Sequence, residues 1–356
     1  MTPRRGRGSN PVHVEIVDKV LTFQSLTFDE ARLLLEQIQQ DAFSDEQLRS
    51  LLLALRAKGE TVDEVAGFAS VMRDSAVPLH NKPAIVVDTA GTGGDGLNTF
   101  NISTAAAFVI AGAGIPVAKH GNRGASSPNG SADVMAALGV SLDLTPEAVE
   151  ACLNELGIAF LFAPKFHRAT ARVAQVRREL GVKTIFNLLG PLTNPAKVRR
   201  QVIGVCSREI ADQIVVVSQR LGSDHVWVVS GDDGADELSV TAPSYISEFK
   251  NGEFAGFELV PEELGFERGE IEDLRGGDAR QNAAYLQNIL LGTDQSSRRD
   301  AVVLNAAAGI YVGGAKSFDD ALRRAQNSLD DGAAYEKLQG LIETSRKLSN
   351  PPIVHS

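Results

Sequence analysis

The chain of 356 residues has little cysteine, no long apolar run and no block of basic residues. Because no apolar run is long enough to cross a bilayer, we expect no membrane span. The first ten residues are basic, but no apolar stretch follows them, so we expect a solvated tail rather than a secretory signal, with a truncated organellar presequence as the alternative. The net charge of −10 and the scattered lysines and arginines argue against nucleic acid as the main partner, but they allow a small anionic substrate.

Only two cysteines are present, Cys152 and Cys206, and they lie far apart in apolar stretches. Neither has a metal-ligating residue at close spacing. We therefore expect both to be core residues of a protein in a reducing compartment, which predicts a cytoplasmic location.

The first 80 residues have the pattern of helices. The five leucines within 48–55 form an apolar face too wide for one neighbour to cover, which predicts a helical domain or a subunit interface. Pro78 and Pro83 then interrupt the pattern and indicate a linker. Three capping boxes predict helix starts, namely Thr27 with Glu30, Ser44 with Gln47 and Thr61 with Glu64.

From residue 84 onward, short apolar runs alternate with helix-like segments. Such alternation predicts an α/β fold with a central, mostly parallel sheet and helices packed on it. The predicted strands are 84–87, 115–118, 158–163, 202–206 and 225–231, and the predicted helices include 103–114, 132–139, 164–181, 211–222 and one beginning at Thr145.

The segment Gly91–Gly96 matches the G-x-G-x-x-G pattern of dinucleotide-binding loops. That motif requires a helix to start within it and an acid about 20 residues later. Here the polar run 98–104 delays the helix, residues 110–119 contain no acid, and Asp95 would repel a pyrophosphate. No Gly-Lys-Ser/Thr follows, so a Walker A loop is excluded as well.

The same segment offers donors for another anion. Gly91, Gly93 and Gly94 allow close approach of backbone N–H groups, and Asn101, Ser103 and Thr104 stand where the next helix begins. A helix N-terminus with free N–H groups and neighbouring hydroxyls is a natural anion site. The alternative is a glycine turn followed by an ordinary helix cap.

A second polar loop follows the next predicted strand and precedes a helix. Because strand-to-helix loops of neighbouring parallel strands meet at the carboxyl edge of a sheet, we expect both loops to face one anion, although a solvated loop is the alternative. The donors expected there are Lys119, Arg123, Ser126, Ser127 and Ser131.

An acidic segment, DDGADELS at 232–239, follows the strand predicted at 225–231. Mg²⁺ takes one or two carboxylates and completes its shell with water and substrate phosphates, which suits Asp236 and Glu237 beside two phosphate-type loops. An exposed turn is the alternative. Asp95 is expected to hold a metal-bound water or a sugar hydroxyl.

The predicted helix 164–181 is rich in arginine. Arg177 or one of its neighbours is suited to a planar, bidentate clamp on a carboxylate. An exposed basic helix face is the alternative.

Together these segments resemble the anthranilate phosphoribosyltransferase family. The resemblance extends from about residue 14 to the C-terminus, and Lys183, where arginine is common, is a minor departure. The segments that carry it, in order, are GTGGD (91–95), NIST (101–104), KHGNRGASS (119–127), the helix start at Ser131, TIFNLLGPLTNPA (184–196), GADELS (234–239) and RGGDARQNA (275–283).

The resemblance implies a helical domain at residues 1–83, onto which 166–194 pack, and an α/β domain at 84–165 and 195–356, with a hinge cleft between them. It implies a homodimer through the helical domain. It further implies transfer of the 5-phosphoribosyl group from phosphoribosyl pyrophosphate (PRPP) to the amine of anthranilate, which yields N-(5-phosphoribosyl)anthranilate and diphosphate in the second step of tryptophan biosynthesis from chorismate.

The resemblance also implies the ligands of each residue. PRPP is expected on Gly91, Gly94, Asp95, Thr99, Asn101, Ile102, Ser103, Thr104, Lys119, His120, Gly121, Asn122, Arg123, Gly124, Ala125, Ser126, Ser127 and Ser131. Anthranilate is expected on Gly91, His120, Asn122, Arg177, Gly190 and Pro191, and two Mg²⁺ ions per subunit on Ser103, Asp236 and Glu237.

No residue is assigned as nucleophile or as general acid or base. His120 is expected to orient the anthranilate carboxylate, with late acceptance of a proton as the alternative. A pyrimidine-nucleoside phosphorylase is the nearest rival, but its Lys-His-Ser-Thr-Gly-Gly phosphate loop is replaced here by Thr-Ala-Gly-Thr-Gly-Gly. A nucleic-acid-binding paralogue of the same fold is a further alternative, which the net charge of −10 disfavours.

Overall fold

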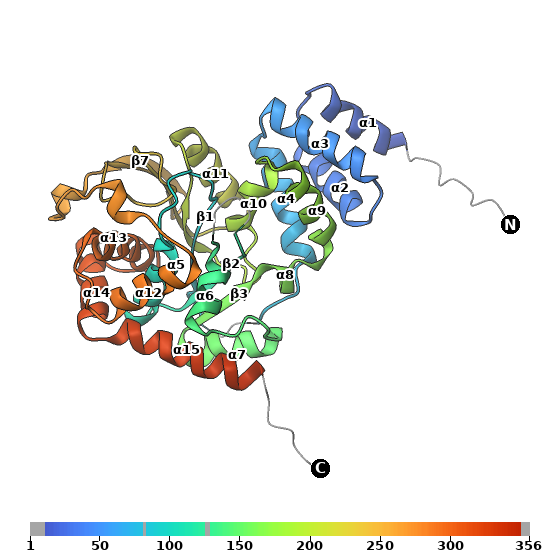
Figure 1. The fold of residues 1–356 in the computed structure, drawn as a ribbon. Coiled ribbons are helices and arrows are strands. Elements are labelled where there is room, and N and C mark those ends of the chain that lie inside the picture. The colour runs from blue at the N-terminus through green and yellow to red at the C-terminus, as the bar shows by residue number, and fades with distance from the viewer. Residues whose placement is uncertain (1–10, 81–82, 125–128, 350–356) are drawn as a thin grey trace, which may run out of the picture.

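The computed structural model describes residues 11–80, 83–124 and 129–349. A helical bundle packs against one side of a larger α/β part, as the view in Figure 1 shows. The predicted fold class is therefore confirmed. The basic tail at 1–10 lies outside the described residues.

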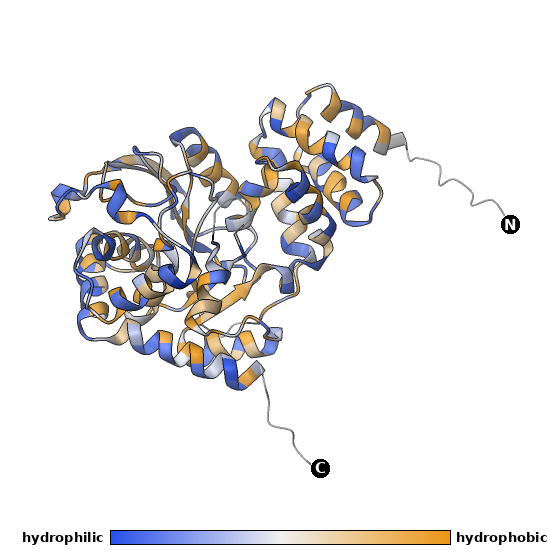
Figure 2. Ribbon diagram, viewed as in Figure 1, coloured by the Kyte–Doolittle hydropathy of each residue, from blue (hydrophilic) through white to orange (hydrophobic). Residues whose placement is uncertain are grey.

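The bundle begins with helices whose starts are fixed by local sequence. Thr27, Ser44 and Thr61 each accept a hydrogen bond from the third residue of the helix that follows, and the reciprocal bond from Glu30, Gln47 or Glu64 forms as well. The helices are amphipathic, as their mixed colouring in Figure 2 shows. They are α1 (Pro11–Leu21), α2 (Phe28–Gln39), α3 (Asp45–Lys58) and α4 (Val62–Ser75).

A later segment returns to the bundle, where α9 packs on α3 and α10 packs on α4. The single helix predicted at 164–181 is wrong, because the backbone of His167 leaves the helical region at φ −110° and ψ 56°. His167 is buried, and this tertiary burial overrides the helix propensity of its neighbours. The segment consists of α8 (Ala163–Phe166), a 3₁₀ turn (Arg168–Thr170), α9 (Ala171–Leu180) and α10 (Ile185–Leu192).

Within the described residues, the α/β part contains one seven-stranded sheet in the order β3-β2-β1-β4-β5-β6-β7. The first five strands are parallel, and β6 and β7 continue the sheet antiparallel. Strand order reverses beside β1, which makes the carboxyl ends of β1, β2 and β4 the expected position for a ligand. The strands are β1 (Val87–Gly91), β2 (Val117–Gly121), β3 (Ile158–Phe162), β4 (Arg200–Gly204), β5 (His225–Gly231), β6 (Ser244–Lys250) and β7 (Glu253–Leu259).

Two of the predicted strands end too early. The strand expected at 84–87 is Val87–Gly91, and the one expected at 115–118 is Val117–Gly121. The polar residues that follow the apolar runs lie inside the sheet, because their side chains find buried partners there. Lys119 and His120 are therefore strand residues, not loop residues.

Helices cover both faces of the sheet. One apolar core joins α5, α13 and α15 to the strands, whereas a second core is shared by the bundle, α10, α11 and the opposite sheet face. No helix of the described part is both long and apolar enough to cross a bilayer. The remaining helices are α5 (Ile102–Gly112), α6 (Ser131–Leu138), α7 (Pro146–Leu156), α11 (Arg208–Arg220), α12 (Ala279–Leu290), α13 (Ser297–Val312), α14 (Phe318–Asp330) and α15 (Ala333–Ser349), with 3₁₀ turns at Pro261–Leu264 and Ile271–Leu274.

Candidate active site

The glycine loop after β1 lies directly against the acidic turn after β5. The N–H of Gly93 donates to Oδ2 of Asp236 at 2.6 Å, and the N–H of Thr92 donates to the carbonyl of Gly204 at 2.8 Å. A Cβ on Gly91 would come within 2.2 Å of Asp236 Oδ2, and one on Gly204 within 1.6 Å of the Asp236 carbonyl oxygen. Glycine is therefore required at both strand ends, because any side chain would push the acidic turn away.

The start of α5 is held by a carboxylate from the same acidic turn. The N–H of Ser103 donates to Oε1 of Glu237 at 3.2 Å. Asn101 precedes the helix, but its side chain makes no capping bond, so the alternative of an ordinary Asn cap is wrong. A negative group therefore already lies at the helix N-terminus, the position that favours anions.

The carboxyl groups of Asp236 and Glu237 are taken out of water. Burial, together with the nearby Asp95 carboxylate, raises the pKa of Asp236 to about 7. Burial, followed by the proximity of Asp236, raises the pKa of Glu237 to about 8, against the opposing effect of Lys119. The exposed-turn alternative is wrong for Asp236, which is 9% exposed, although Asp232 of the same turn is exposed and pairs with Arg208.

Lys119 supplies the positive charge of this group from within β2. Its side chain is buried, and Nζ donates to the carbonyl of Thr89 at 2.6 Å and to Oγ of Ser103 at 3.4 Å. Burial lowers the pKa of Lys119, while the charges of Asp88 and Glu237 act in the opposite direction. The structure thus brings Lys119, Ser103 and both acids of the turn together.

The second loop contributes less to this group than its composition suggests. Arg123 pairs with Asp133 at 2.8 Å, and its side chain is 60% exposed, so its contacts stay within the loop and the following helix. Ser131, the first residue of α6, lies beside the end of β2, where a Cβ on Gly121 would come within 2.1 Å of its Oγ. Of the other predicted donors, Ala125, Ser126 and Ser127 lie outside the described residues.

The other predicted phosphate contacts have these positions. Gly94 has a positive φ of 76°, Thr99 forms an isolated bridge with Arg275, and the Asp95 carboxylate accepts from the N–H of Leu97 at 3.1 Å. Ile102 is buried in the first turn of α5, and Thr104 Oγ1 is buried without a hydrogen-bond partner among the described residues. Asn122 Oδ1 accepts from the N–H of Arg123, and the N–H of Gly124 donates to Asp133.

A second group of side chains forms where β2 meets α10. His120 Nδ1 lies 3.1 Å from the carbonyl oxygen of Gly190. Because a carbonyl only accepts, Nδ1 carries the proton and Nε2 is left as an acceptor, buried and without a partner among the described residues. Burial lowers the pKa of His120 to about 3, so the ring is neutral. A Cβ on Gly190 would meet no atom within 4 Å, which leaves open space beside this carbonyl.

Arg177 of α9 is bonded to α10, the helix that also contacts His120. The Arg177 Nη2 donates to Asn187 Oδ1 at 3.2 Å, its guanidinium lies 5.5 Å from the Phe186 ring, and its Nε has no partner within the described part of the chain. Burial lowers the pKa of Arg177. The neighbouring Pro191 lies inside α10, and its carbonyl accepts from Gln201.

Several residues of the site were not predicted from the sequence. The His167 ring lies 5.2 Å from that of His120, and neither of its nitrogens has a partner among the described residues. Asp88 is buried in β1 and accepts from the His120 N–H at 3.2 Å and from Asn194 at 2.8 Å. The sequence does show Asp88 as a charged residue just before the glycine loop. It does not show that the partner of Asp88 is Asn194, 106 positions away.

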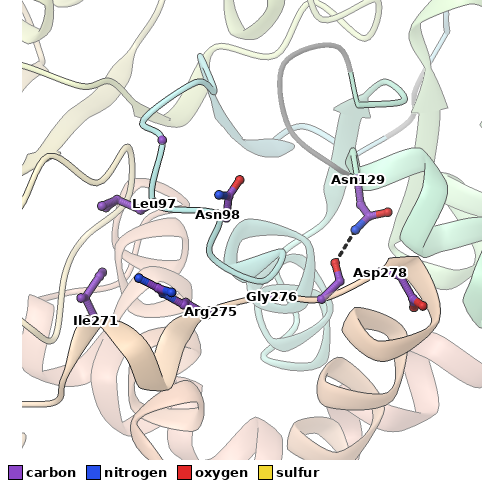
Figure 3. A pocket seen from close by; sticks show the side chains of 9 residues that line it. Leu97, Asn98, Asn129, Ile271, Arg275, Gly276 and Asp278 are labelled. Carbon is purple, nitrogen blue, oxygen red and sulfur yellow. Dashed lines mark hydrogen bonds between the residues drawn. The ribbon is translucent and has the colours of Figure 1, made fainter.

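A cavity of about 600 Å³ lies on the outer side of the glycine loop (Figure 3). It separates Leu97 and Asn98 from Ile271 and Arg275, and Asn129 reaches across it to the glycine pair before α12. The lining residues are Gly96, Leu97, Asn98, Asn129, Ile271, Arg275, Gly276, Gly277 and Asp278.

Two models of one glycosyl transferase family match the chain. The helical bundle domain of the family matches residues 14–76, and its a/b domain matches residues 83–335. The chain is 50% identical to an anthranilate phosphoribosyltransferase of Pelotomaculum thermopropionicum over 334 residues, which cover 94% of this chain and 96% of that protein.

Solved structures give the same result. The anthranilate phosphoribosyltransferase of Thermus thermophilus is similar at a TM-score of 0.87 and 41% identity, covering 93% of this chain and 99% of that chain. The yeast enzyme, solved in complex with PRPP and Mg, is similar at a TM-score of 0.85 and 25% identity, with coverages of 96% and 99%. The same yeast enzyme solved with 4-fluoroanthranilate has a TM-score of 0.82 and 26% identity, with coverages of 94% and 98%.

The burial of His167 predicts a loss of stability in acid. Burial lowers its pKa to about 4, below the ordinary value near 6.5, so the unfolded chain binds a proton that the folded chain excludes. The stabilisation is present above pH 6.5 and is lost as the pH falls toward 4, by about 2 kcal/mol at pH 5. In urea unfolding at pH 7.5 and pH 5, His167→Asn should therefore lose less stability than the wild type.

His80→Asn is the matched control, because His80 is exposed. This variant should keep the wild-type difference between the two pH values. An equal pH dependence in His167→Asn and the wild type would contradict the assignment.

Proposed function

The chain belongs to the anthranilate phosphoribosyltransferase family, and from this premise we propose that it transfers the 5-phosphoribosyl group of PRPP to the amine of anthranilate. The products are N-(5-phosphoribosyl)anthranilate and diphosphate. The observation that carries the proposal is the meeting of the glycine loop, the α5 N-terminus, Lys119 and the acidic turn at one edge of the sheet.

PRPP binds at this edge. The glycine loop and the first turn of α5 bring backbone N–H groups to this edge, of which those of Gly93 and Ser103 donate to Asp236 and Glu237, and Lys119 adds a buried positive charge. Such preorganised donors bind an anion without further ordering. The predicted PRPP contacts on both loops remain part of this proposal.

The acidic turn suits Mg²⁺. Asp236 and Glu237 are two adjacent carboxyl groups whose pKa values burial raises to about 7 and about 8, so a cation would relieve an unfavourable concentration of negative charge. Two carboxylates and the Ser103 hydroxyl fit a cation that shares its shell with substrate oxygens and water. Ser103, Asp236 and Glu237 would hold two ions per subunit, whose charge stabilises the diphosphate as it leaves.

Anthranilate binds where β2 meets α10. The partly unpaired guanidinium of Arg177 is a partner for the carboxylate, since a buried arginine gains more from a charged acceptor than from the Asn187 amide. His120 presents the lone pair of Nε2 because Gly190 fixes its tautomer. A neutral acceptor can receive a hydrogen bond from the N–H of the aromatic amine, whereas it would repel a carboxylate. We therefore propose that His120 orients the amine, which replaces the role in orienting the carboxylate that was expected from the sequence. Gly91, Asn122 and Pro191 complete the predicted contacts.

The mechanism requires little proton chemistry. An aromatic amine is neutral near pH 7, so its lone pair is available without a general base. Diphosphate leaves as the sugar carbon gains oxocarbenium character, and the barrier is mainly one of charge and position. The chain stabilises the leaving group with the glycine loop, the α5 N-terminus and Lys119, and His120 holds the amine.

The domain division at residues 1–83 with 166–194, against 84–165 with 195–356, is part of the proposal, as is a hinge between the two. Its support is the packing of α9 and α10 on the bundle, although α11 shares the apolar core of that bundle. A homodimer through the bundle is also proposed. Its support is a set of exposed apolar side chains on or beside α1, α2 and α3, namely Val14, Leu21, Phe23, Leu33 and Leu53.

We also propose a cytoplasmic location for the protein. Both cysteines are free, which suits a reducing compartment. Cys152 is buried as expected, whereas Cys206 is half-buried.

One assay tests the function directly. The purified chain is mixed with PRPP, Mg²⁺ and anthranilate, and anthranilate fluorescence should fall as the product forms. A parallel reaction supplies thymidine or uridine with inorganic phosphate. Turnover in the second reaction alone would replace the proposal with a pyrimidine-nucleoside phosphorylase.

Arg177→Ala should separate the two substrates. Losing a charged partner of the carboxylate should raise the KM for anthranilate by about 10- to 100-fold, with little change in the KM for PRPP. Steady-state kinetics with each substrate varied would measure both. Arg178→Ala is the control, because the adjacent arginine is exposed. Equal losses for the two substrates in Arg177→Ala would contradict the clamp.

Asp236→Asn combined with Glu237→Gln should weaken the response to metal. The concentration of Mg²⁺ at half-maximal rate should rise by about tenfold or more, because both anionic oxygen donors become neutral amides. Asp232→Asn, an exposed acid of the same turn, should leave the titration unchanged. If the double variant also kept the wild-type titration, the acidic turn would have no role in binding metal.

Leu21→Asp combined with Leu53→Asp should convert the dimer to monomer. A charge on each exposed leucine opposes burial at a subunit interface, and light scattering would report the mass. Leu291→Asp is the control, since Leu291 is a comparably exposed leucine of the α/β part. A monomeric wild type, or a double variant that remains dimeric, would contradict this interface.

A further inference from the structure

The segment RGGDARQNA at 275–283 lies beside residues 98–100, which follow the glycine loop. None of the roles proposed above involves this segment. It runs from the end of a 3₁₀ turn into α12 and lines the cavity of Figure 3 together with Leu97 and Asn98. Phe100 N–H donates to the carbonyl of Leu274 at 2.9 Å, and Gly276 N–H donates to the carbonyl of Asn98 at 2.8 Å. The backbone that leads to Asn101 is therefore paired with this segment on its outer side.

Asn282 in the first turn of α12 connects this segment to Asn101. Its side chain is 4% exposed. Oδ1 of Asn282 accepts from the N–H of Gly277 at 2.7 Å, and Nδ2 donates to Oδ1 of Asn101 at 3.1 Å. The side chain passes over Gly276, where an added Cβ would lie 2.9 Å from Asn282 Oδ1 and 3.1 Å from the Phe100 Cα.

These bonds determine which way each amide faces. The backbone N–H of Gly277 can only donate, so the Asn282 atom that meets it is the carbonyl oxygen. The NH₂ group of Asn282 then faces Asn101, and the Asn101 atom that meets it is also an oxygen. The Asn101 NH₂ is left facing away from α12, and it donates to no residue in the described part of the chain. An NH₂ donor fixed at the start of α5 can bind an anion. The reversed amide would instead turn its carbonyl oxygen toward the anion and repel it.

We propose that Asn282 is a positioning residue for PRPP: it orients the Asn101 amide so that an NH₂ donor, rather than a carbonyl oxygen, faces the phosphoribosyl substrate. This inference rests on the proposed function, because it takes PRPP as the anion of this site. The orientation is fixed before the substrate arrives, so binding does not have to select between two amide rotamers.

Asn282→Ala should raise the KM for PRPP by about tenfold, with kcat and the KM for anthranilate within about twofold of wild type. Asn282→Asp distinguishes positioning from support of the loop. The carboxylate still accepts from Gly277, but it presents an acceptor to Asn101 and so turns the Asn101 carbonyl toward PRPP. The KM for PRPP should therefore stay raised in Asn282→Asp, whereas a role limited to the Gly277 bond predicts rescue.

A double-mutant cycle tests whether the effect passes through Asn101. In an Asn101→Ala background, Asn282→Ala should change the KM for PRPP by less than about twofold, because the amide that it orients is gone. Gln281→Ala is the matched control. Gln281 is adjacent to Asn282, and its side chain accepts a capping hydrogen bond from the N–H of Asp278. Loss of this bond should lower the melting temperature without raising the KM for PRPP.

The outcomes separate this inference from the function on which it rests. A wild-type protein that fails to consume anthranilate with PRPP and Mg²⁺ would overturn the proposed function. A wild-type protein that turns over, with additive effects of Asn101→Ala and Asn282→Ala or with rescue in Asn282→Asp, would overturn only the positioning role.

Discussion

Two hydrogen bonds from backbone N–H groups to the acidic turn hold the centre of the molecule together. Gly93 donates to Asp236 and Ser103 donates to Glu237, so the loops after β1 and β5 and the start of α5 form one electrostatic unit. The cost of burying two carboxyl groups is visible in their raised pKa values. Lys119, buried beside Ser103, offsets part of that cost. This arrangement supports the proposal of a second cation, and of a ligand that brings its own negative charge, at this site.

The features predicted best from the sequence are those that depend on neighbouring residues. All three capping boxes formed, because each requires only a residue and the one three positions later. The position of the glycine loop and the acidic turn at one edge was also predictable, since parallel strands place their following loops at the same edge of a sheet. What failed was the extent of β1 and β2. Asp88, Lys119 and His120 lie in buried strands because they pair with groups that are distant in sequence, and local hydropathy does not record such pairs.

The half of the site near α10 was harder to predict for the same reason. Arg177 was chosen for its charge, but the sequence did not show that His167 would break the helix and lie against His120. The proton position on His120 also depends on the Gly190 carbonyl, 70 residues away in the chain. Long-range packing of α9 and α10 on the bundle brings these groups together, and no short motif encodes that packing.

The glycines at the ends of β1 and β4 have a consequence for altering this catalyst. Gly91 and Gly204 lie so close to Asp236 that a methyl group on either would come within 2.2 Å of one of its oxygens, so neither position has room for a side chain. Beside Gly190, by contrast, an added methyl group would meet no atom within 4 Å. On the proposed function, variants that accept other aromatic amines can thus be sought by changing residues of α9 and α10, while the residues proposed to bind PRPP are kept. The two halves of the reaction are in this sense separately adjustable.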